Sequence, residues 1–379
     1  MHFAFTQEQE QLREAARGFL STHSSSEAVR RAMQTERGFD PDVWKRIGSE
    51  LGWPAILVPE EYGGLGLGWV EVVALFELTG EALLCAPLFS TICLGANALL
   101  LAGSEEQKAE WLPGIAEGRA IVTLAWAESA RDPGSEQIRA TARRDGESFV
   151  LSGRKRTVVD GADADAIVVA TRALGTTGAA GIELFLVPGD APGLVRRAVP
   201  TLDPTRRIAE IELHDVRLPA TSRMARDGDG AAALAKILDR AAIGLAAEQV
   251  GGAQRCLDLS VEYAKGRVQF GRPIGSFQAI KHKCANMLVK VESARSASYY
   301  AACVAAEDGA ELMAAASLAK AYCSEAYFRC AAECLQIHGG VGFTWEYDVH
   351  LYLKRAKASE SFLGSPPWHR ERIANHMGL

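Results

Sequence analysis

A cationic run between residues 265 and 283 is the part of this sequence best suited to binding a polyanion. Its five cations are Lys265, Arg267, Arg272, Lys281 and Lys283. The nearest acidic residues are Glu262 and Glu292, although the whole chain carries a net charge of −6. Arginine offers forked donors to a phosphate or pyrophosphate, and Phe270 or Phe277 offers a face for stacking. A solvated basic loop is the alternative, and the residues by themselves leave both interpretations open.

The glycine-rich run HGGVG, residues 338–342, is a second candidate. It follows a predicted helix, so the glycines either end that helix in a left-handed cap or let a ligand approach the backbone closely. A dinucleotide-binding GxGxxG motif is not supported, because that motif follows a strand and opens a helix.

Other catalytic signatures are absent from the sequence. It contains no GxxxxGK[ST], GxSxG or HExxH motif. Its eight cysteines form no CxxC pair and no Cys/His cluster at zinc spacing. We therefore expect no metal site, and reduced thiols in a cytoplasmic protein.

Hydrophobic periodicity divides the chain into three zones that must position these residues. The period is helical from residue 1 to about 118, close to two from 121 to about 224, and helical again from 231 to about 358. These zones predict an α+β fold. Its parts are an N-terminal helical domain (1–119), a middle antiparallel β-barrel or sandwich (120–225) and a C-terminal four-helix bundle (226–379).

Local signals add helix ends and faces to this outline. A helix is predicted to begin near Thr6, where a loose capping box runs to Gln9 and Glu10. Another is predicted to begin in the segment 103–107, where Ser104 is typical of a cap. Apolar residues recur at intervals of three and four on one predicted helical face: Ile280, Cys284, Met287, Leu288, Val291 and Ala294.

The stretch from Ala82 to Ser104 carries no charged residue and has the length of a membrane span. Pro87 would interrupt a single helix, and acidic residues flank the stretch without the Lys/Arg bias of a membrane protein. Two short buried helices are therefore expected, with no membrane span. The acidic net charge also argues against a nucleic-acid partner.

Three separated motifs show that this sequence resembles the acyl-CoA dehydrogenase family. They are PEEYGGLGL at residues 59–67, YAKGRVQFGRPIGSFQAIKHK at 263–283 and QIHGGVGFTWEYDVHLYLKRAK at 336–357. The resemblance covers the whole chain and agrees with the α/β/α order. It implies FAD as cofactor, an acyl-CoA substrate, electron-transfer flavoprotein as acceptor, and a tetramer composed of one chain or of two homologous chains.

The resemblance also assigns cofactor contacts. Arg267, Phe270 and Gln278 would hold the FAD pyrophosphate and adenosine across a subunit interface. Gln336, Gly339 and Gly340 would contact the same cofactor from the adjoining subunit. The segments beside the flavin ring supply Trp126, Ala127 and Val159, and the last two replace hydroxyl-bearing residues of the family.

The family's usual catalytic glutamate is missing. Anchoring AK at 356–357 and GS at 364–365 places Leu363 at that position, and leucine cannot accept a proton. A minority of the family carries the base on an earlier helix, just before an arginine, and this position is Asp239. A helix ion pair with Lys236 is the structural alternative for Asp239, and Glu360 is a lesser candidate for the base.

The resulting prediction is FAD-dependent α,β-dehydrogenation of an acyl-CoA to the trans-2-enoyl-CoA, with Asp239 as base. Two alternatives stay open. One is a catalytically incomplete subunit of a mixed complex, and the other is a flavin-dependent oxygenase on the same fold.

Overall fold

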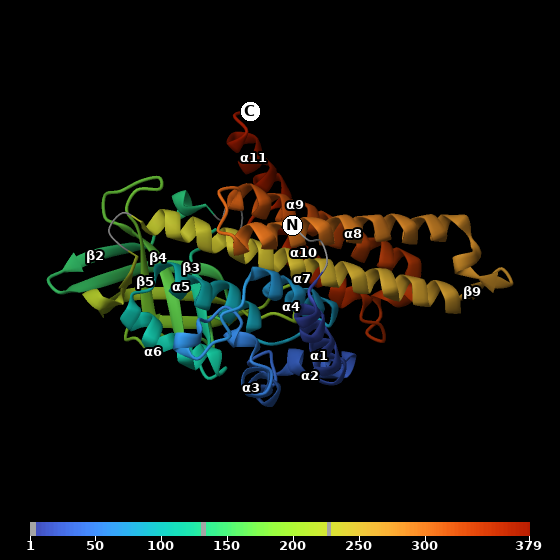
Figure 1. Ribbon diagram of the computed structural model, residues 1–379, viewed down its shortest axis with the longest axis horizontal. Coiled ribbons are helices and arrows are strands. Elements are labelled where there is room, and N and C mark those ends of the chain that lie inside the picture. Colours follow the sequence, from blue (N-terminus) through green and yellow to red (C-terminus); the bar gives the residue numbers. More distant parts are fainter. Residues whose placement is uncertain (1–4, 130–133, 226–228) are drawn as a thin grey trace. The chain divides into compact units, whose positions relative to one another are not determined.

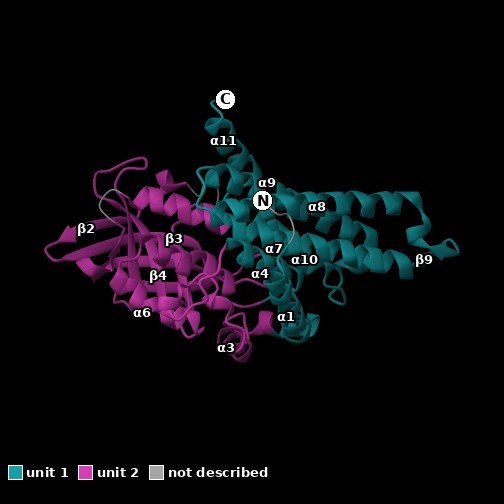
Figure 2. Cartoon of the chain, viewed as in Figure 1, with its two compact units in different colours: residues 1–31, 69–84, 242–379 teal, residues 32–68, 85–241 magenta. Residues whose placement is uncertain are grey.

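The computed structural model describes residues 5–129, 134–225 and 229–379 (Figure 1). The chain divides into two compact units, coloured separately in Figure 2. The first comprises residues 1–31, 69–84 and 242–379, and the second comprises residues 32–68 and 85–241. The division falls inside helices α2 and α7. The domain boundaries expected near residues 119 and 225 stay a prediction.

The first unit is helical. Its helices are α1 (Gln7–His23), the start of α2 (Ser26–Gln34), α4 (Trp69–Glu81), most of α7 (Gly230–Gly266), α8 (Gln278–Ala306), α9 (Leu312–His338), α10 (Val349–Ser361) and α11 (Pro366–His376). Alanine-rich α9 packs against α8, α10 and α11. Two short strands, β9 (Val268–Gln269) and β10 (Arg272–Pro273), form the hairpin that joins the far ends of α7 and α8 in Figure 1.

Glycine lets α4 and α7 cross with their backbones nearly touching. A Cβ atom on Gly80 would lie 2.0 Å from the Glu248 carbonyl oxygen, and one on Gly251 would lie 1.7 Å from the Glu77 carbonyl oxygen. Any larger residue at either position would force the helices apart.

The predicted helix starts at Thr6 and Ser104 are confirmed. Gln9 donates its backbone N–H to Thr6 Oγ1 while its side chain accepts from the Thr6 N–H, and Ser104 and Gln107 repeat this arrangement. On the predicted apolar face of α8, Met287, Val291 and Ala294 are buried, but Leu288 is 49% exposed.

The second unit combines helices with a sheet. Its helices are α3 (Pro41–Ser49), a π-helical segment (Ser90–Ala96), α5 (Asn97–Ala102), α6 (Glu105–Ala116) and the first turns of α7. The π-helical segment and α5 cover residues 90–102 of the uncharged stretch, most of which are buried. Among the described residues, no helix combines the length and apolarity needed to cross a membrane.

The sheet fills the middle of the sequence. Its strands are β1 (Val122–Ala125), β2 (Thr141–Asp145), β3 (Ser148–Val159), β4 (Ala166–Ala173), β5 (Ile182–Pro188), β6 (Leu194–Val199), β7 (Ile208–Pro219) and β8 (Arg223–Met224). The strand order is β6-β7-β3-β2-β4-β5-β8, and β1 pairs with β4. The order of helices, sheet and helices confirms the predicted fold class. The sheet is mixed rather than purely antiparallel, because β4 lies parallel to both β1 and β2.

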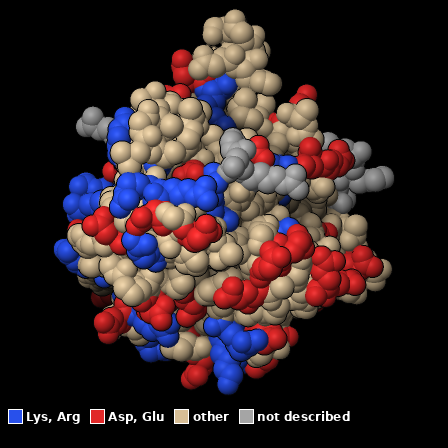
Figure 3. Space-filling view, turned by 90° about the vertical axis from the view of Figure 1, so that its left-hand side faces the viewer, with Lys and Arg blue, Asp and Glu red and all other residues tan. Residues whose placement is uncertain are grey.

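Strands β3, β6 and β7 carry charges of both signs. Arg154 on β3 and Arg197 on β6 pair with Glu212 on β7, and Arg156 pairs with Glu210. Cationic and anionic side chains likewise share the face shown in Figure 3. Such cross-strand pairs favour the observed register over one shifted by a residue.

Candidate cofactor and active site

The cationic run folds into the β9–β10 hairpin, whose tip is Phe270 and Gly271. Both residues have positive φ, +55° and +79°, as a two-residue hairpin turn requires. Phenylalanine is unusual there, because its side chain disfavours this conformation, and it is 92% exposed. A costly backbone geometry and an unburied aromatic ring at one position are typical of a residue that meets a ligand or partner.

The cations around the hairpin are largely uncompensated. Lys283 pairs with Glu333, and the Arg272 guanidinium lies 4.1 Å from the centre of the Phe277 ring. In the part of the chain that the structure describes, Lys265, Arg267 and Lys281 form no ion pair. The hairpin therefore offers an anion several cations that no acid among the described residues neutralises.

The glycines after α9 adopt a different geometry from the left-handed cap. Gly339 has φ +61° and ψ −142°, a region that only glycine occupies readily. A Cβ atom at Gly339 or Gly340 would meet nothing within 4 Å. Because Gly340 has no positive φ, its backbone conformation does not require glycine. The open space favours the close approach of a ligand, and Gln336 is exposed on the last turn of the same helix.

An aromatic contact joins the two motifs within one chain. Tyr263, one turn before Arg267, stacks on His338 with ring centres 4.3 Å apart. His338 directly precedes Gly339, and its Nδ1 lies 2.8 Å from the Cys334 carbonyl oxygen. Both motifs thus lie at the same end of the helical unit. Together they present cations, an aromatic ring and open backbone, which suits a pyrophosphate bearing a planar base.

The residues predicted beside a flavin ring lie in the sheet unit. The Ala127 carbonyl oxygen accepts from the Arg156 N–H at 2.7 Å, and the Val159 carbonyl oxygen accepts from Thr123 Oγ1 at 2.8 Å. The segment after β1 therefore runs beside the end of β3. Trp126 and Val159 are buried. The expected segment at 125–132 is described only as far as Ser129, so Ala130, Arg131 and Asp132 lie outside the described residues.

Lys155 links β3 to the segment after β1. Its side chain is fully buried, and its Nζ donates to Glu128 Oε1 at 2.7 Å and to the Trp126 carbonyl oxygen at 3.3 Å. Burial lowers the pKa of Lys155 to about 8, and Glu128 opposes that shift. No sequence signal singled out Lys155, since its partners lie 27 and 29 residues away.

Asp239 lies on α7 and is 6% exposed. The helix around it is tied to the uncharged stretch by Asn97, whose amide donates to the carbonyl oxygens of Ile237 and Cys93, both at 3.0 Å. On that stretch, Leu94 and Leu99 are both fully buried. A carboxylate in such surroundings has the water-poor setting that a general base needs.

The uncharged stretch also contacts the sheet. A Cβ atom on Gly95 would lie 2.2 Å from the Val122 carbonyl oxygen of β1, and Ser90 Oγ donates to Asp160 Oδ2 at 2.5 Å. Asp160 directly follows Val159. Residues of this stretch thus contact both the helix that carries Asp239 and the sheet, at strand β1 just before Ala127 and at Asp160, which follows Val159 of β3.

The position of the family's usual base, Leu363, and the lesser candidate, Glu360, lie in the helical unit. Leu363 is 4% exposed and has φ +60°, and its carbonyl oxygen accepts from His369 Nε2 at 2.9 Å. Glu360 forms an ion pair with Lys357 at 2.5 Å, and Lys357 is exposed. Leu363 thus occupies a firmly held buried position, whereas the Glu360 carboxylate is paired with an exposed lysine.

A buried lysine that sequence reasoning missed holds the segment around Leu363. Lys320 Nζ donates to the carbonyl oxygens of Ser359, Glu360 and Gly364 at 3.1–3.2 Å and to Ser324 Oγ at 2.8 Å. Burial lowers the pKa of Lys320 to about 7. The sequence did contain a signal for this residue, because Lys320 lies on the buried face of an alanine-rich helix. A buried charge needs hydrogen-bond partners, so such a lysine predicts a polar contact.

Metal ligation finds no support among the residues that the structure describes. They contain no group of three or more His, Cys, Asp or Glu side chains placed to hold a metal ion. The eight cysteines are free thiols, and burial raises the pKa of Cys323 and Cys330 to about 12.

Comparisons with known proteins agree across the whole chain. Three family descriptions match: "Acyl-CoA dehydrogenase, N-terminal domain" at residues 6–119, "middle domain" at 124–216 and "C-terminal domain" at 228–378. Acyl-CoA dehydrogenase IpdE2 of Mycolicibacterium smegmatis is 35% identical over 97% of this chain and 98% of its own length.

Solved structures give the same result. Butyryl-CoA dehydrogenase from Megasphaera elsdenii matches with a TM-score of 0.90 and 26% identity over the full length of both chains. A chain of the ChsE4-ChsE5 complex from Mycobacterium tuberculosis matches with a TM-score of 0.90 and 28% identity, covering 100% of this chain and 99% of that one.

Proposed function

This chain belongs to the acyl-CoA dehydrogenase family, and from that premise we propose that it oxidises an acyl-CoA thioester to the trans-2-enoyl-CoA with FAD as cofactor. Electron-transfer flavoprotein then reoxidises the cofactor. Membership makes the chain a flavoprotein oxidoreductase; the particular flavin, the substrate and the acceptor belong to the proposal. The main support for this proposal is at the end of the helical unit where α7 ends and α8 begins. Cations without an ion-pair partner, the exposed Phe270 ring and glycines with free space around them lie together there.

The cofactor's phosphates and adenosine would be held by Arg267, Phe270 and Gln278, with Gln336, Gly339 and Gly340 completing the contact. Arg267 supplies the forked donors and Phe270 the ring face. At the flavin end, Ala127 and Val159 offer no hydroxyl, so the ring must rely on backbone donors and on packing against Trp126. The bound cofactor would accept the hydride that leaves the substrate's β carbon.

The chain's own part in the reaction is proton removal and exclusion of water. The Asp239 carboxylate would take the α proton, and the electron pair of that C–H bond would form the new α,β double bond as hydride leaves the β carbon. The buried layer formed by the π-helical segment and α5 would keep water from the acyl group. Aspartate is one methylene shorter than glutamate, so the substrate's α carbon must approach α7 closely.

Substituting the base tests this function. Purified holoprotein is expected to show a flavin absorption spectrum that an acyl-CoA bleaches, and Asp239→Asn should lower the rate of dye reduction by about 10²- to 10⁴-fold with the flavin still bound. Asp258→Asn, on the same helix, is the matched control and should keep the parent rate. An Asp239→Asn protein as active as the parent would rule out Asp239 as the base.

A second candidate, the catalytically incomplete subunit of a mixed complex, is favoured by Leu363 and by exposed apolar side chains on α8 and α9. Leu288 and Val289 on α8 and Leu318 and Tyr322 on α9 are all at least 36% exposed. The ChsE4-ChsE5 complex is a solved relative that contains two different chains. This candidate predicts no dye reduction by the chain alone, and activity on co-expression with a homologue that persists in Asp239→Asn.

A further inference from the structure

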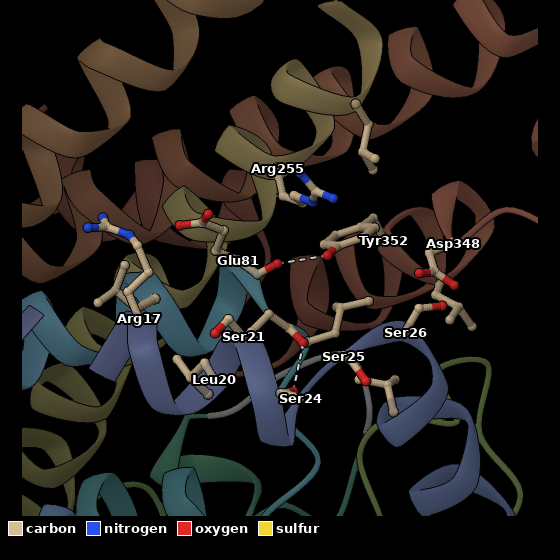
Figure 4. Close-up of a pocket in the computed structure, with 16 residues that line it drawn as sticks. Arg17, Leu20, Ser21, Ser24, Ser25, Ser26, Glu81, Arg255, Asp348 and Tyr352 are labelled. Carbon is tan, nitrogen blue, oxygen red and sulfur yellow. Dashed lines mark hydrogen bonds between the residues drawn. The ribbon is translucent and has the colours of Figure 1, made fainter. Parts of the chain in front are cut away.

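A cavity of about 310 Å³ lies in the helical unit, lined by residues of α1, α2, α4, α7 and α10 (Figure 4). None of its lining residues is a predicted cofactor contact or a candidate for the base. Its floor is apolar and firmly packed. The floor residues are Leu20, Val29, Leu78, Leu83 and Leu351, none more than 4% exposed.

Three charged groups lie close together on one side of this cavity. Figure 4 shows the Glu81 carboxylate between the guanidinium groups of Arg17 and Arg255. Neither arginine forms an ion pair or hydrogen bond with it in the described part of the chain. Arg255 has only a 3.8 Å contact with Glu262, and Arg17 forms no ion pair among the described residues. The two guanidinium groups are therefore available to a ligand.

The remaining charge at the cavity is already neutralised. Asp348 lines the opposite side and pairs with Arg30 at 2.6 Å. Glu81 offsets one of the two arginines that line the cavity, so the lining residues together with Arg30 carry one positive charge in excess. Two further acids lie nearby but do not line the cavity: Glu262, which is exposed and 3.8 Å from Arg255, and Asp258 near Glu81. Burial raises the pKa of Glu81, although Arg17 and Arg255 oppose that shift. A doubly charged anion would face repulsion from Glu81, whereas a single negative charge balances the site.

We propose that this cavity binds a short aliphatic monocarboxylate, with its carboxylate held by Arg17 and Arg255 and its hydrocarbon chain on the leucine floor. Guanidinium groups match a carboxylate's two oxygens, and partial burial strengthens the contact. An apolar floor beside a few placed charges is the usual composition of a small-molecule site, and the volume lies at the small end of such sites. The site is independent of the proposed dehydrogenation.

Isothermal titration of the holoprotein with three probes of matched chain length tests the charge requirement. Sodium butyrate is expected to bind, while 1-butanol and n-butylamine are expected to bind at least tenfold more weakly because they lack the negative charge. Equal binding of butyrate and butylamine would overturn the proposal. So would no detectable butyrate binding at about 50 mM, a concentration that still detects affinities in the millimolar range.

Two substitutions then locate the site. Arg17→Gln and Arg255→Gln should each weaken butyrate binding at least tenfold, and Arg31→Gln should leave it unchanged. Arg31 is the control because it is exposed on α2, does not line the cavity and pairs only at 3.8 Å with Glu27. Butyrate bound equally well by the parent and both cavity variants would place the ligand elsewhere. The three-probe series on the parent remains decisive if either variant fails to fold.

Discussion

The buried imidazole of His369 should make this protein sensitive to mild acid. His369 is 1% exposed, and its Nε2 donates to the Leu363 carbonyl oxygen, while its buried Nδ1 has no hydrogen-bond partner. Protonation would place a charge on Nδ1 without an acceptor and near Lys320 and Arg372. Burial, with a contribution from those two cations, lowers the pKa of His369 to about 3.

The sign and size of the effect follow from the two protonation equilibria. The folded-state pKa of about 3 lies below the ordinary value of 6.5, so between these values the unfolded chain binds a proton that the folded chain refuses. Stability is therefore complete above pH 6.5 and falls as the pH drops toward 3. Between pH 7 and pH 5 this single group should lower the free energy of unfolding by about 2 kcal/mol.

Urea unfolding at pH 7 and pH 5 measures this loss. His369→Gln keeps an N–H that can reach the Leu363 carbonyl oxygen but cannot titrate, so its loss between the two pH values should be about 2 kcal/mol smaller than the parent's. His282→Gln, at an exposed position, is the control and should lose as much as the parent. If His369→Gln and the parent lose the same free energy on acidification, the buried neutral imidazole is not the cause.

Three further substitutions test the packing in thermal or urea unfolding. Thr91→Val should leave stability unchanged or raise it by about 1 kcal/mol, because Thr91 Oγ1 is buried without a partner; a loss above 1 kcal/mol would contradict this. Arg355→Met should cost about 3 kcal/mol, because it removes the cation facing the buried Glu248 carboxylate; a cost near zero would show that the pair adds nothing. Gly95→Ala should cost at least about 2 kcal/mol, since the added methyl would lie 2.2 Å from the Val122 carbonyl oxygen; a neutral result would mean that the backbones separate easily.

The helix–sheet–helix order could be predicted from the sequence because periodicity is a local signal. The capping boxes at Thr6 and Ser104 need only residues within one turn, and both form. Strands β2 and β6 had no such signal. The segments TARRD and LVRRAV carry two arginines each, and β6 is an edge strand with an exposed face. Only their pairing with β3 and β7 makes them strands.

The candidate site was predictable to the extent that its motifs are continuous in the sequence. The hairpin cations and the glycines after α9 were identified, but their meeting depends on Tyr263 and His338, whose stacking joins segments 75 residues apart. Lys320 was missed for the same reason, because its carbonyl partners lie about 40 residues later. Leu288 belongs to the predicted apolar face yet is 49% exposed, because helical periodicity does not distinguish a core face from one left open.

The structure around Leu363 bears on which residue is the catalytic base. A leucine at φ +60° costs about 1 kcal/mol or more, and the segment keeps this conformation because Lys320 and His369 bind the carbonyl oxygens of residues 359–364. That support holds the backbone whatever side chain position 363 carries. The chain thus keeps a firmly held backbone at position 363, where the resemblance places the family's catalytic glutamate. The side chain at that position is not an acid. Asp239, buried on α7, then becomes the carboxylate on which independent activity would depend.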